Sequence, residues 1–465
     1  MSAPKIPTPP AVGDARQSAH ATFQRWLGDE YDLDALDVML ATAAVERLDG
    51  DPLWLLIISG SGNAKTETVQ ALDGIGATVT STISSPGALF SATSKRERTE
   101  DATGGLLRKI GDDGVLVVKD VTSILSMNRD MRAEVLGAIR EVYDGRWSRN
   151  VGTDGGKTLD WTGRIAVIGA VTTAWDRAHD VISSMGDRFV LLRMDSTEGR
   201  QRAGRQAIGN TGHEIAMRAE LAECVGEVIE TMNLEPVTLV EAEVETLLVA
   251  ADLVTLSRTG VDYDYRGDVI DAHAPEMPTR FAKQLAQVVR GSCAIGIDRD
   301  ESLKLAIRCA RDSMPPLRLA IVDDVAANPG STTAEVRKRL GKPRSTVDRQ
   351  LQALHMLGVL QCTEEEATWG AREVTRWHYT LAEGIDPAAL NHEKLTRFVS
   401  THPQPPLEVP DRAPSVRLPP DISGEVSDPV EDPVELDLDS LRGDVCATCN
   451  SYGGHTARCP ERKVG

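Results

Sequence analysis

The stretch LLIISGSGNAKTET, Leu55 to Thr68, decides the fold prediction: an apolar run ends in a glycine-bearing turn, and a Lys-Thr pair follows. A phosphate-binding loop has the pattern G-x-x-x-x-G-K-[ST]. If Lys65 and Thr66 end that pattern, its two glycine positions hold Ser59 and Ala64. Taken alone, the stretch fits a nucleotide site and an ordinary strand, turn and helix equally well.

The physical requirements of a phosphate site are nevertheless mostly met. Residues 53–58 predict a buried strand, and the helix after the turn begins with amides that favour phosphate. Lys65 would reach the β- and γ-phosphates, and Thr66 would ligate Mg²⁺. If position 64 needs a positive φ, alanine costs about 1 kcal/mol there, which a site tolerates. The expected nucleotide-binding residues are Gly60, Gly62, Asn63, Ala64, Lys65, Thr66 and Glu67.

The composition sets limits on partners and location. A chain of 465 residues holds two or three domains. The formal net charge of −19 argues against a generally basic surface, so any contact with nucleic acid must be local. The N-terminal residues lack the apolar core of a signal peptide, and the longest apolar run, LWLLII, is too short to cross a bilayer. We expect a cytoplasmic protein with no membrane partner.

The pattern along the chain predicts several segments. Short β-branched runs alternate with helical stretches up to Asp195, which predicts a three-layer α/β domain. The expected segments are an N-terminal tail (1–35), the α/β core (36–195), a helical lid (196–312), a helix-helix-helix-hairpin module (315–382), a disordered acidic, Pro-rich linker (403–445) and a cysteine-rich tail (446–459).

Three further features of the α/β segment favour the nucleotide interpretation. GVLVVKDVTSIL (114–125) places Asp120 at the tip of a second apolar strand, where an acid can hold the Mg²⁺ water shell. Residues 146–161 predict a β-hairpin, and the strand after it ends at Thr172 and Thr173. MGDRFVLLRM (185–194) places Arg188 just before a fourth strand. The four features in this order predict a nucleoside triphosphatase.

With these motifs, residues 36–312 resemble the AAA+ ATPases, and most closely the phage- and plasmid-type replicative helicase ATPases and their MCM-like relatives. The block LVVKDVTSILSMNRDMRAEVLGAIREVYDGRWSRNVGT (116–153) is similar to the core of phage-type members. The resemblance implies ATP bound between subunits of a homo-oligomeric ring, with the hairpin lining the pore. It also implies roles for single residues: Lys65 and Thr66 as Walker A, Asp120 as Walker B, Thr172 or Thr173 as sensor 1, Arg188 as arginine finger and Arg280 as sensor 2.

One departure concerns the catalytic acid. A Walker B strand normally ends in Asp-Glu, whereas Val121 follows Asp120. An alternative register puts Lys119 in the Asp place, but a lysine would be repelled by Mg²⁺. The acid that activates water is therefore open among Glu67, Glu134 and Glu141, and a slow or switch-like ATPase is one expectation.

Residues 317–361 have the layout of a winged helix-turn-helix. Gly341-Lys342-Pro343 forms the turn, and a third helix begins near Arg344. In such folds the start of that helix enters the major groove of DNA. The alternative is a module that contacts protein, but the local excess of Lys and Arg favours DNA. The expected DNA-binding residues are Lys342, Arg344, Ser345, Thr346 and Arg349.

The tail sequence CATCNSYGGHTARC has the spacing C-x₂-C-x₅-H-x₃-C. Three thiolates and an imidazole suit tetrahedral Zn²⁺. The expected zinc ligands are Cys446, Cys449, His455 and Cys459, similar to a zinc knuckle; the alternative is a disordered tail with chance cysteines.

Together these features predict a DNA-dependent ATPase with ATP, Mg²⁺ and Zn²⁺ as ligands, most simply a helicase or translocase similar to those of phages or mobile elements. Its expected partners are DNA, further copies of itself and other replication proteins. The alternative is an ATP-gated transcription regulator that binds an operator through the winged helix. An ATPase rate that rises with non-specific DNA would separate the two.

Overall fold

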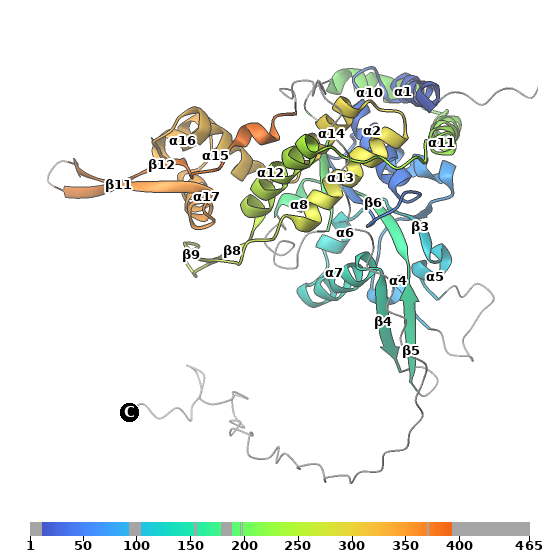
Figure 1. Ribbon diagram of the computed structural model, residues 1–465, viewed down its shortest axis with the longest axis horizontal. Helices are drawn as coiled ribbons and strands as arrows, with labels where there is room; N and C mark the ends of the chain where they lie inside the picture. Colours follow the sequence, from blue (N-terminus) through green and yellow to red (C-terminus); the bar gives the residue numbers. More distant parts are fainter. Residues whose placement is uncertain are drawn as a thin grey trace, which may run out of the picture. The chain divides into compact units, whose positions relative to one another are not determined.

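The computed structural model describes residues 12–92, 104–152, 156–177, 188–195, 197, 199–369 and 372–392 (Figure 1). All of these belong to one compact unit, Met1–Leu407. The acidic linker 403–445 and the predicted zinc ligands Cys446, Cys449, His455 and Cys459 lie outside the described residues.

A five-stranded parallel sheet forms the centre of the fold, in the order β2-β3-β6-β1-β7. The predicted α/β fold class is confirmed. Because the strands are parallel, the loops after β1, β3 and β6 all leave from the same carboxyl edge. The strands are β1 (Trp54–Ile58), β2 (Thr78–Thr80), β3 (Asp113–Val118), β6 (Arg164–Val171) and β7 (Val190–Arg193).

The sheet is covered on both faces, as a parallel sheet requires. Successive β1 residues alternate between two cores: Leu55 and Ile57 join the larger one, and Trp54, Leu56 and Ile58 join the smaller one. The helices whose residues enter the larger core include α2 (Leu33–Val45), α11 (Glu214–Glu230), α12 (Glu241–Arg258), α13 (Thr279–Ala294) and α14 (Arg299–Asp312). Those of the smaller core are α4 (Pro86–Leu89), α5 (Leu106–Ile110), α6 (Thr122–Leu125), α7 (Arg129–Tyr143) and α8 (Ala174–Arg177).

The predicted hairpin before the third core strand is present. It consists of β4 (Arg146–Val151) and β5 (Lys157–Thr162), paired antiparallel (Figure 1). Its base belongs to the smaller core, because Trp147, Leu159 and Trp161 are buried there. The hairpin is therefore anchored to the α/β core by its apolar face.

The N-terminal segment differs from the expectation of a tail over residues 1–35. Residues Val12–Leu27 form helix α1. Ala15, Ala19 and Phe23 recur every four residues and are buried, and Arg16 Nη1 donates to Asp37 Oδ2 of α2 at 2.9 Å. The expectation of a tail is wrong for this helix, because small alanines make a weak apolar stripe in the sequence.

The segment 196–312 is mostly helical, as predicted, and adds α10 (Arg200–Gly209) to the helices above. It also contains a hairpin that the sequence did not suggest: β8 (Val261–Tyr263) paired antiparallel with β9 (Val269–Ala272). The larger core runs without a break from α1 through these helices to Leu390. The helices therefore share their core with the sheet.

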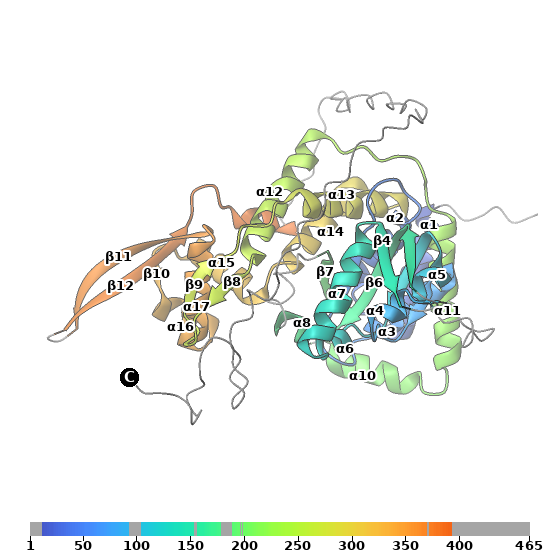
Figure 2. The same ribbon diagram turned by 90° about the horizontal axis from the view of Figure 1, so that it is seen from below.

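The module 315–382 follows directly. Its helices are α15 (Pro316–Ala327), α16 (Thr333–Leu340) and α17 (Arg344–Met356), and its sheet has the order β10-β12-β11 (Figure 2). The strands are β10 (Ser331–Thr332), β11 (Leu360–Trp369) and β12 (Arg372–Leu381). The turn before α17 uses Gly341 at φ +62°, where a side chain would be strained.

One buried arginine joins this module to the preceding helices. Arg318 of α15 donates from Nη1 to the carbonyls of Ser257 and Thr259 at 2.7 Å each, and from Nε to Gln350 Oε1 of α17 at 2.9 Å. The guanidinium therefore binds the carboxyl end of α12 and the third helix of the module together.

No described helix is long and apolar enough to cross a membrane.

Candidate nucleotide-binding site

The loop after β1 has the backbone that the sequence suggested. Ser59 N donates to Val171 O at 3.3 Å, Gly62 has φ +80° and Ala64 has φ +52°. Ala64 is the one non-glycine residue with positive φ in the described part of the chain. Position 64 therefore adopts a positive φ. This left-handed conformation costs roughly 1–2 kcal/mol for a residue with a Cβ.

Ser59 stands where the pattern has glycine, and the structure gives it a partner. Its side chain is buried, and Asn63 Nδ2 donates to its Oγ at 2.6 Å. The same Nδ2 donates to Asp195 O, beyond β7, at 2.7 Å. The Asn63 amide therefore closes the loop from inside and ties it to the adjacent strand.

Lys65 lies inside this loop. The residue is 8% exposed, and Nζ donates to Ser59 O at 3.0 Å and to Gly60 O. Burial lowers the pKa of the ammonium, and the nearby carboxylate of Asp120 acts in the opposite direction. A partly desolvated cation next to a glycine-bearing turn is a group that attracts phosphate.

Asp120 follows β3 at the same edge. Its Oδ1 accepts from Thr122 N at 2.9 Å, and its own amide donates to Ser81 O at 3.1 Å. The side chain is exposed, whereas Val121 is buried and donates its amide to Ala170 O of β6. Asp120 therefore faces outward from the edge, and the apolar residue after it packs into the sheet.

The end of β6 reaches the end of β3 through a threonine that the sequence analysis did not single out. Thr122 Oγ1 lies 3.4 Å from Thr172 Oγ1 and accepts from Thr172 N at 3.3 Å. Thr173 is exposed next to it. The structure thus brings Lys65, Asp120 and Thr172 to one edge of the sheet, and Thr122 links two of them.

A second set of missed residues lies behind the loop, at Tyr31 and at the start of α2. Tyr31 Oη lies 2.8 Å from Thr68 Oγ1, which donates to Ala64 O at 3.0 Å. Arg308 of α14 donates to Asp34 at 2.9 Å and to Asp32. These contacts join residues far apart in the chain, so no local motif could reveal them.

The three candidate acids lie in different surroundings. Glu67 accepts from Nε and Nη2 of Arg218 on α11, both at 2.9 Å, and is half-buried. Glu134 and Glu141 are exposed on α7. Glu67 is thus engaged in a bidentate ion pair, which favours a structural role for it.

Arg188 and Arg280 lie away from the loop. Val190 pairs with Leu55 and Arg193 with Ile58, so Arg188 precedes β7 at the amino edge of the sheet. At about 3.3 Å per residue, it is roughly 15–20 Å from the loop that follows β1. Arg188 Nη2 lies 3.5 Å from Asp144 Oδ2, and burial and then the positive charge of Arg280 lower its pKa.

The five predicted DNA-binding residues differ in their surroundings, because four are exposed and one contacts another hairpin. Lys342, Arg344, Ser345 and Thr346 are exposed at the start of α17. Arg349 is half-buried, and its Nη2 donates to the carbonyl of Arg266 in the β8–β9 hairpin at 2.7 Å.

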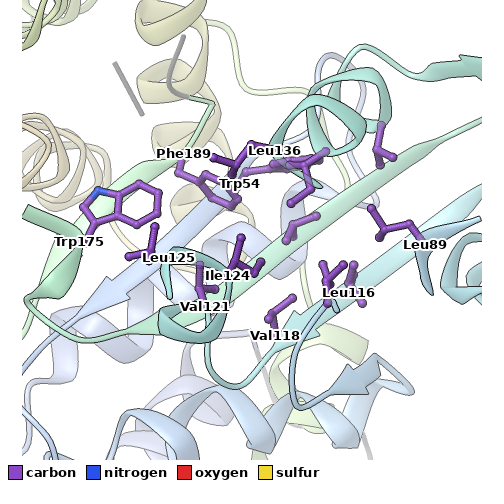
Figure 3. A pocket seen from close by; sticks show the side chains of 14 residues that line it. Trp54, Leu89, Leu116, Val118, Val121, Ile124, Leu125, Leu136, Trp175 and Phe189 are labelled. Carbon is purple, nitrogen blue, oxygen red and sulfur yellow. The ribbon is translucent and has the colours of Figure 1, made fainter. Parts of the chain in front are cut away.

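A small apolar cavity of about 30 Å³ lies in the smaller core (Figure 3). Trp54, Leu116, Val118, Leu136 and Phe189 are among the side chains around it. An apolar void of this size offers water no hydrogen-bond partners, so it is a packing defect of the core.

The residues at the carboxyl edge could hold Mg²⁺ only if phosphate oxygens supplied further ligands. Mg²⁺ is usually bound by one or two protein oxygens, several waters and phosphates. Thr66 is exposed at the start of α3 (Lys65–Gln70), and Asp120 is exposed beyond β3. Among the described residues, no group of three or more His, Cys, Asp or Glu side chains has the arrangement of a metal site.

Comparison with known proteins gives little. No family model and no curated protein matches the chain. Solved structures that match include the apo A form of the C-terminal region of NrS-1, at 11% identity and a TM-score of 0.27, over 81% of this chain and 77% of that one. A second structure of that region, 305–718, has 11% identity and a TM-score of 0.22, over 81% and 76%. Similarity this weak carries no argument about fold or function.

Proposed function

We propose that the chain is a DNA-dependent ATPase of the AAA+ kind, acting as a helicase or translocase. The observation that carries the proposal is the position of the Lys65 ammonium. It lies on the carbonyls of a strand-end loop, at the edge that also holds Asp120 and Thr172. Open α/β sheets bind ligands at this edge. Lys65 would hold the phosphates, and Thr66 and Asp120 would hold Mg²⁺. The metal would neutralise the negative charge that develops on the phosphates during transfer.

The location of Arg188 supports assembly into a ring. An arginine at the amino edge is too far from its own loop to contact a nucleotide there. A head-to-tail ring joins two different surfaces of the subunit, and we infer one in which the amino edge of one subunit meets the carboxyl edge of the next. Arg188, with Arg280 nearby, would then complete the site of the neighbouring subunit.

The module 315–382 would contact DNA through α17. Arg344 in its first turn and Lys342 just before the helix are exposed, whereas the exposed part of β11 carries Glu364, Glu365 and Glu366. Phosphate repels these acids, so we assign the contact to the helix.

A second candidate function is an ATP-gated transcription regulator. The observations in its favour are that the buried Val121 follows Asp120, where a Walker B strand has Glu, and that Glu67 is paired with Arg218. Such a protein would bind ATP and hydrolyse it slowly. Its winged helix would recognise one operator sequence.

The ATPase rate, measured with and without random-sequence duplex DNA, tests the proposal. A helicase or translocase gives a rate that rises with DNA and depends on Lys65. A regulator gives a low rate that DNA does not change, together with tight binding to one enriched sequence. Absence of nucleotide binding would reject both.

The tail motif is proposed to hold one zinc ion through Cys446, Cys449, His455 and Cys459. Deprotonated thiolates and a neutral imidazole make folding of such a knuckle depend on the metal. Elemental analysis of protein purified without chelators should give one zinc per chain. A Cys446→Ser variant should lose the zinc and keep its ATPase rate.

A further inference from the structure

The β8–β9 hairpin has a tip of defined geometry. Asp264 Oδ1 accepts from the amides of Arg266 and Asp268 at 2.8 and 2.9 Å. Gly267 has φ +82°, a conformation that suits glycine. The side chain of Asp264 is thus directed into the turn, and the tip is fixed rather than loose.

This tip lies directly against α17 (Figures 1 and 2). Arg349 Nη2 donates to Arg266 O at 2.7 Å. A Cβ on Gly267 would lie 2.4 Å from the same nitrogen. The contact therefore needs glycine at the tip, and it makes the tip continuous with the third helix of the module.

Two side chains at the tip are presented to solvent. Tyr265 is 87% exposed, the largest value among the large apolar and aromatic side chains of the described residues. The Arg266 guanidinium carbon lies 5.1 Å from the centre of its ring. An exposed aromatic ring with an arginine beside it is the pair that stacks on an unpaired base and binds its phosphate.

We propose that the tip of this hairpin is a second DNA-contacting element, which extends the surface of α17. Arg266 binds a backbone phosphate, and the Tyr265 ring stacks on an unpaired base beside the duplex. The inference rests on the proposed DNA-binding role of α17. The occupant is DNA because Arg266, Lys342 and Arg344 are exposed and their charges attract phosphate. Asp262, Asp268 and Asp271 of the hairpin are exposed too and repel phosphate, so the contact is assigned to Tyr265 and Arg266 alone.

The test measures binding of the full chain to a short duplex, and to the same duplex with a single-stranded extension, at two salt concentrations. The variants are Arg266→Ala, Tyr265→Ala, Tyr265→Phe and Arg344→Ala. Arg205→Ala is the matched control, because Arg205 is an exposed arginine on α10. Arg266→Ala keeps the carbonyl that binds Arg349, so the hairpin contact is retained.

We expect the extension to strengthen wild-type binding and Tyr265→Ala to weaken binding of the extended probe on the order of tenfold, with the salt slope unchanged. Tyr265→Phe should bind as the wild type does. Arg266→Ala should lower the salt slope by about one unit on both probes.

Two results overturn the inference and leave the proposed function intact. In one, Arg344→Ala weakens binding while both tip variants bind like Arg205→Ala. In the other, the tip variants bind more tightly, which would mean that the hairpin shields α17. Absence of wild-type binding to either probe at low salt would reject the DNA-binding role of α17 and this inference with it.

Discussion

The two edges of the central sheet carry different halves of one proposed site. The carboxyl edge holds Lys65, Asp120 and Thr172, at the ends of β1, β3 and β6. The amino edge holds Arg188, with Asp144 in contact and Arg280 near enough to lower its pKa. The first half has the groups that we propose to bind phosphate and metal, whereas the second half has the cations Arg188 and Arg280.

The surroundings of the two cations differ as well. Lys65 is held by backbone carbonyls, which carry no net charge and release an ammonium easily. Arg188 lies beside Tyr143 with its guanidinium carbon 5.9 Å from the ring centre, and Gln284 of α13 donates to its carbonyl at 2.6 Å. In the proposed site, Lys65 would exchange these carbonyls for phosphate oxygens, whereas Arg188 is held in position by its contacts.

The largest effect is expected at the carboxyl edge. Lys65→Ala should abolish binding of Mg-ATP, because no other cation lies within the loop to replace the hydration that the phosphates lose. Nucleotide binding by calorimetry or a fluorescent ATP analogue measures this. Lys109→Ala, which removes an exposed lysine from α5, is the control and should bind normally. Unchanged affinity in Lys65→Ala would reject the assignment of the loop.

The next effect tests whether the amino edge works in a neighbouring subunit. Arg188→Ala should bind ATP normally and hydrolyse it about 10³-fold more slowly, the size of an arginine-finger effect. Arg177→Ala, an exposed arginine on α8, should hydrolyse ATP normally.

Mixing the two inactive variants sharpens this result. Lys65→Ala and Arg188→Ala subunits together form some interfaces with an intact lysine and an intact arginine. Those interfaces should restore part of the ATPase rate. If both variants assemble and no mixing ratio restores activity, the two edges do not form one site.

A smaller effect locates the group that activates water. Glu67→Gln should lower the ATPase rate by less than tenfold, because Arg218 already binds both of its oxygens. Loss of a general base costs about 10²–10⁴-fold. Glu134→Gln and Glu141→Gln in the same assay provide the comparison. A loss above 10²-fold in Glu67→Gln alone would assign the base to the carboxyl edge.

The sequence predicted those parts of the fold that depend on neighbours in the chain. The apolar run of β1, the glycines after it and Lys65 form one local pattern, and so do the turn and third helix around Gly341 and Arg344. The central strands and the β4–β5 hairpin were found for the same reason.

The remainder depends on contacts between distant residues. The Asn63 amide donates to the carbonyl of Asp195, 132 residues further along the chain. Glu67 is paired with Arg218, 151 residues away. The β8–β9 hairpin was missed because its short strands carry several aspartates and lack an apolar alternation. The opposite placement of Lys65 and Arg188 required the register between β1 and β7.

The smallest effect concerns Ala64, one of the two residues that stand where the phosphate-loop pattern has glycine. Ala64 has φ +52°, which costs roughly 1–2 kcal/mol, whereas glycine adopts this conformation freely but loses about 0.4–1 kcal/mol through the unfolded chain. Ala64→Gly should therefore raise the free energy of unfolding by only about 0.5 kcal/mol, measured by denaturant titration, with ATP affinity unchanged. Ala64→Val should lower it by more than about 1 kcal/mol, because a β-branched residue tolerates positive φ poorly. Equal stability of the two variants would contradict the left-handed conformation at position 64, and with it the resemblance of this turn to a phosphate loop.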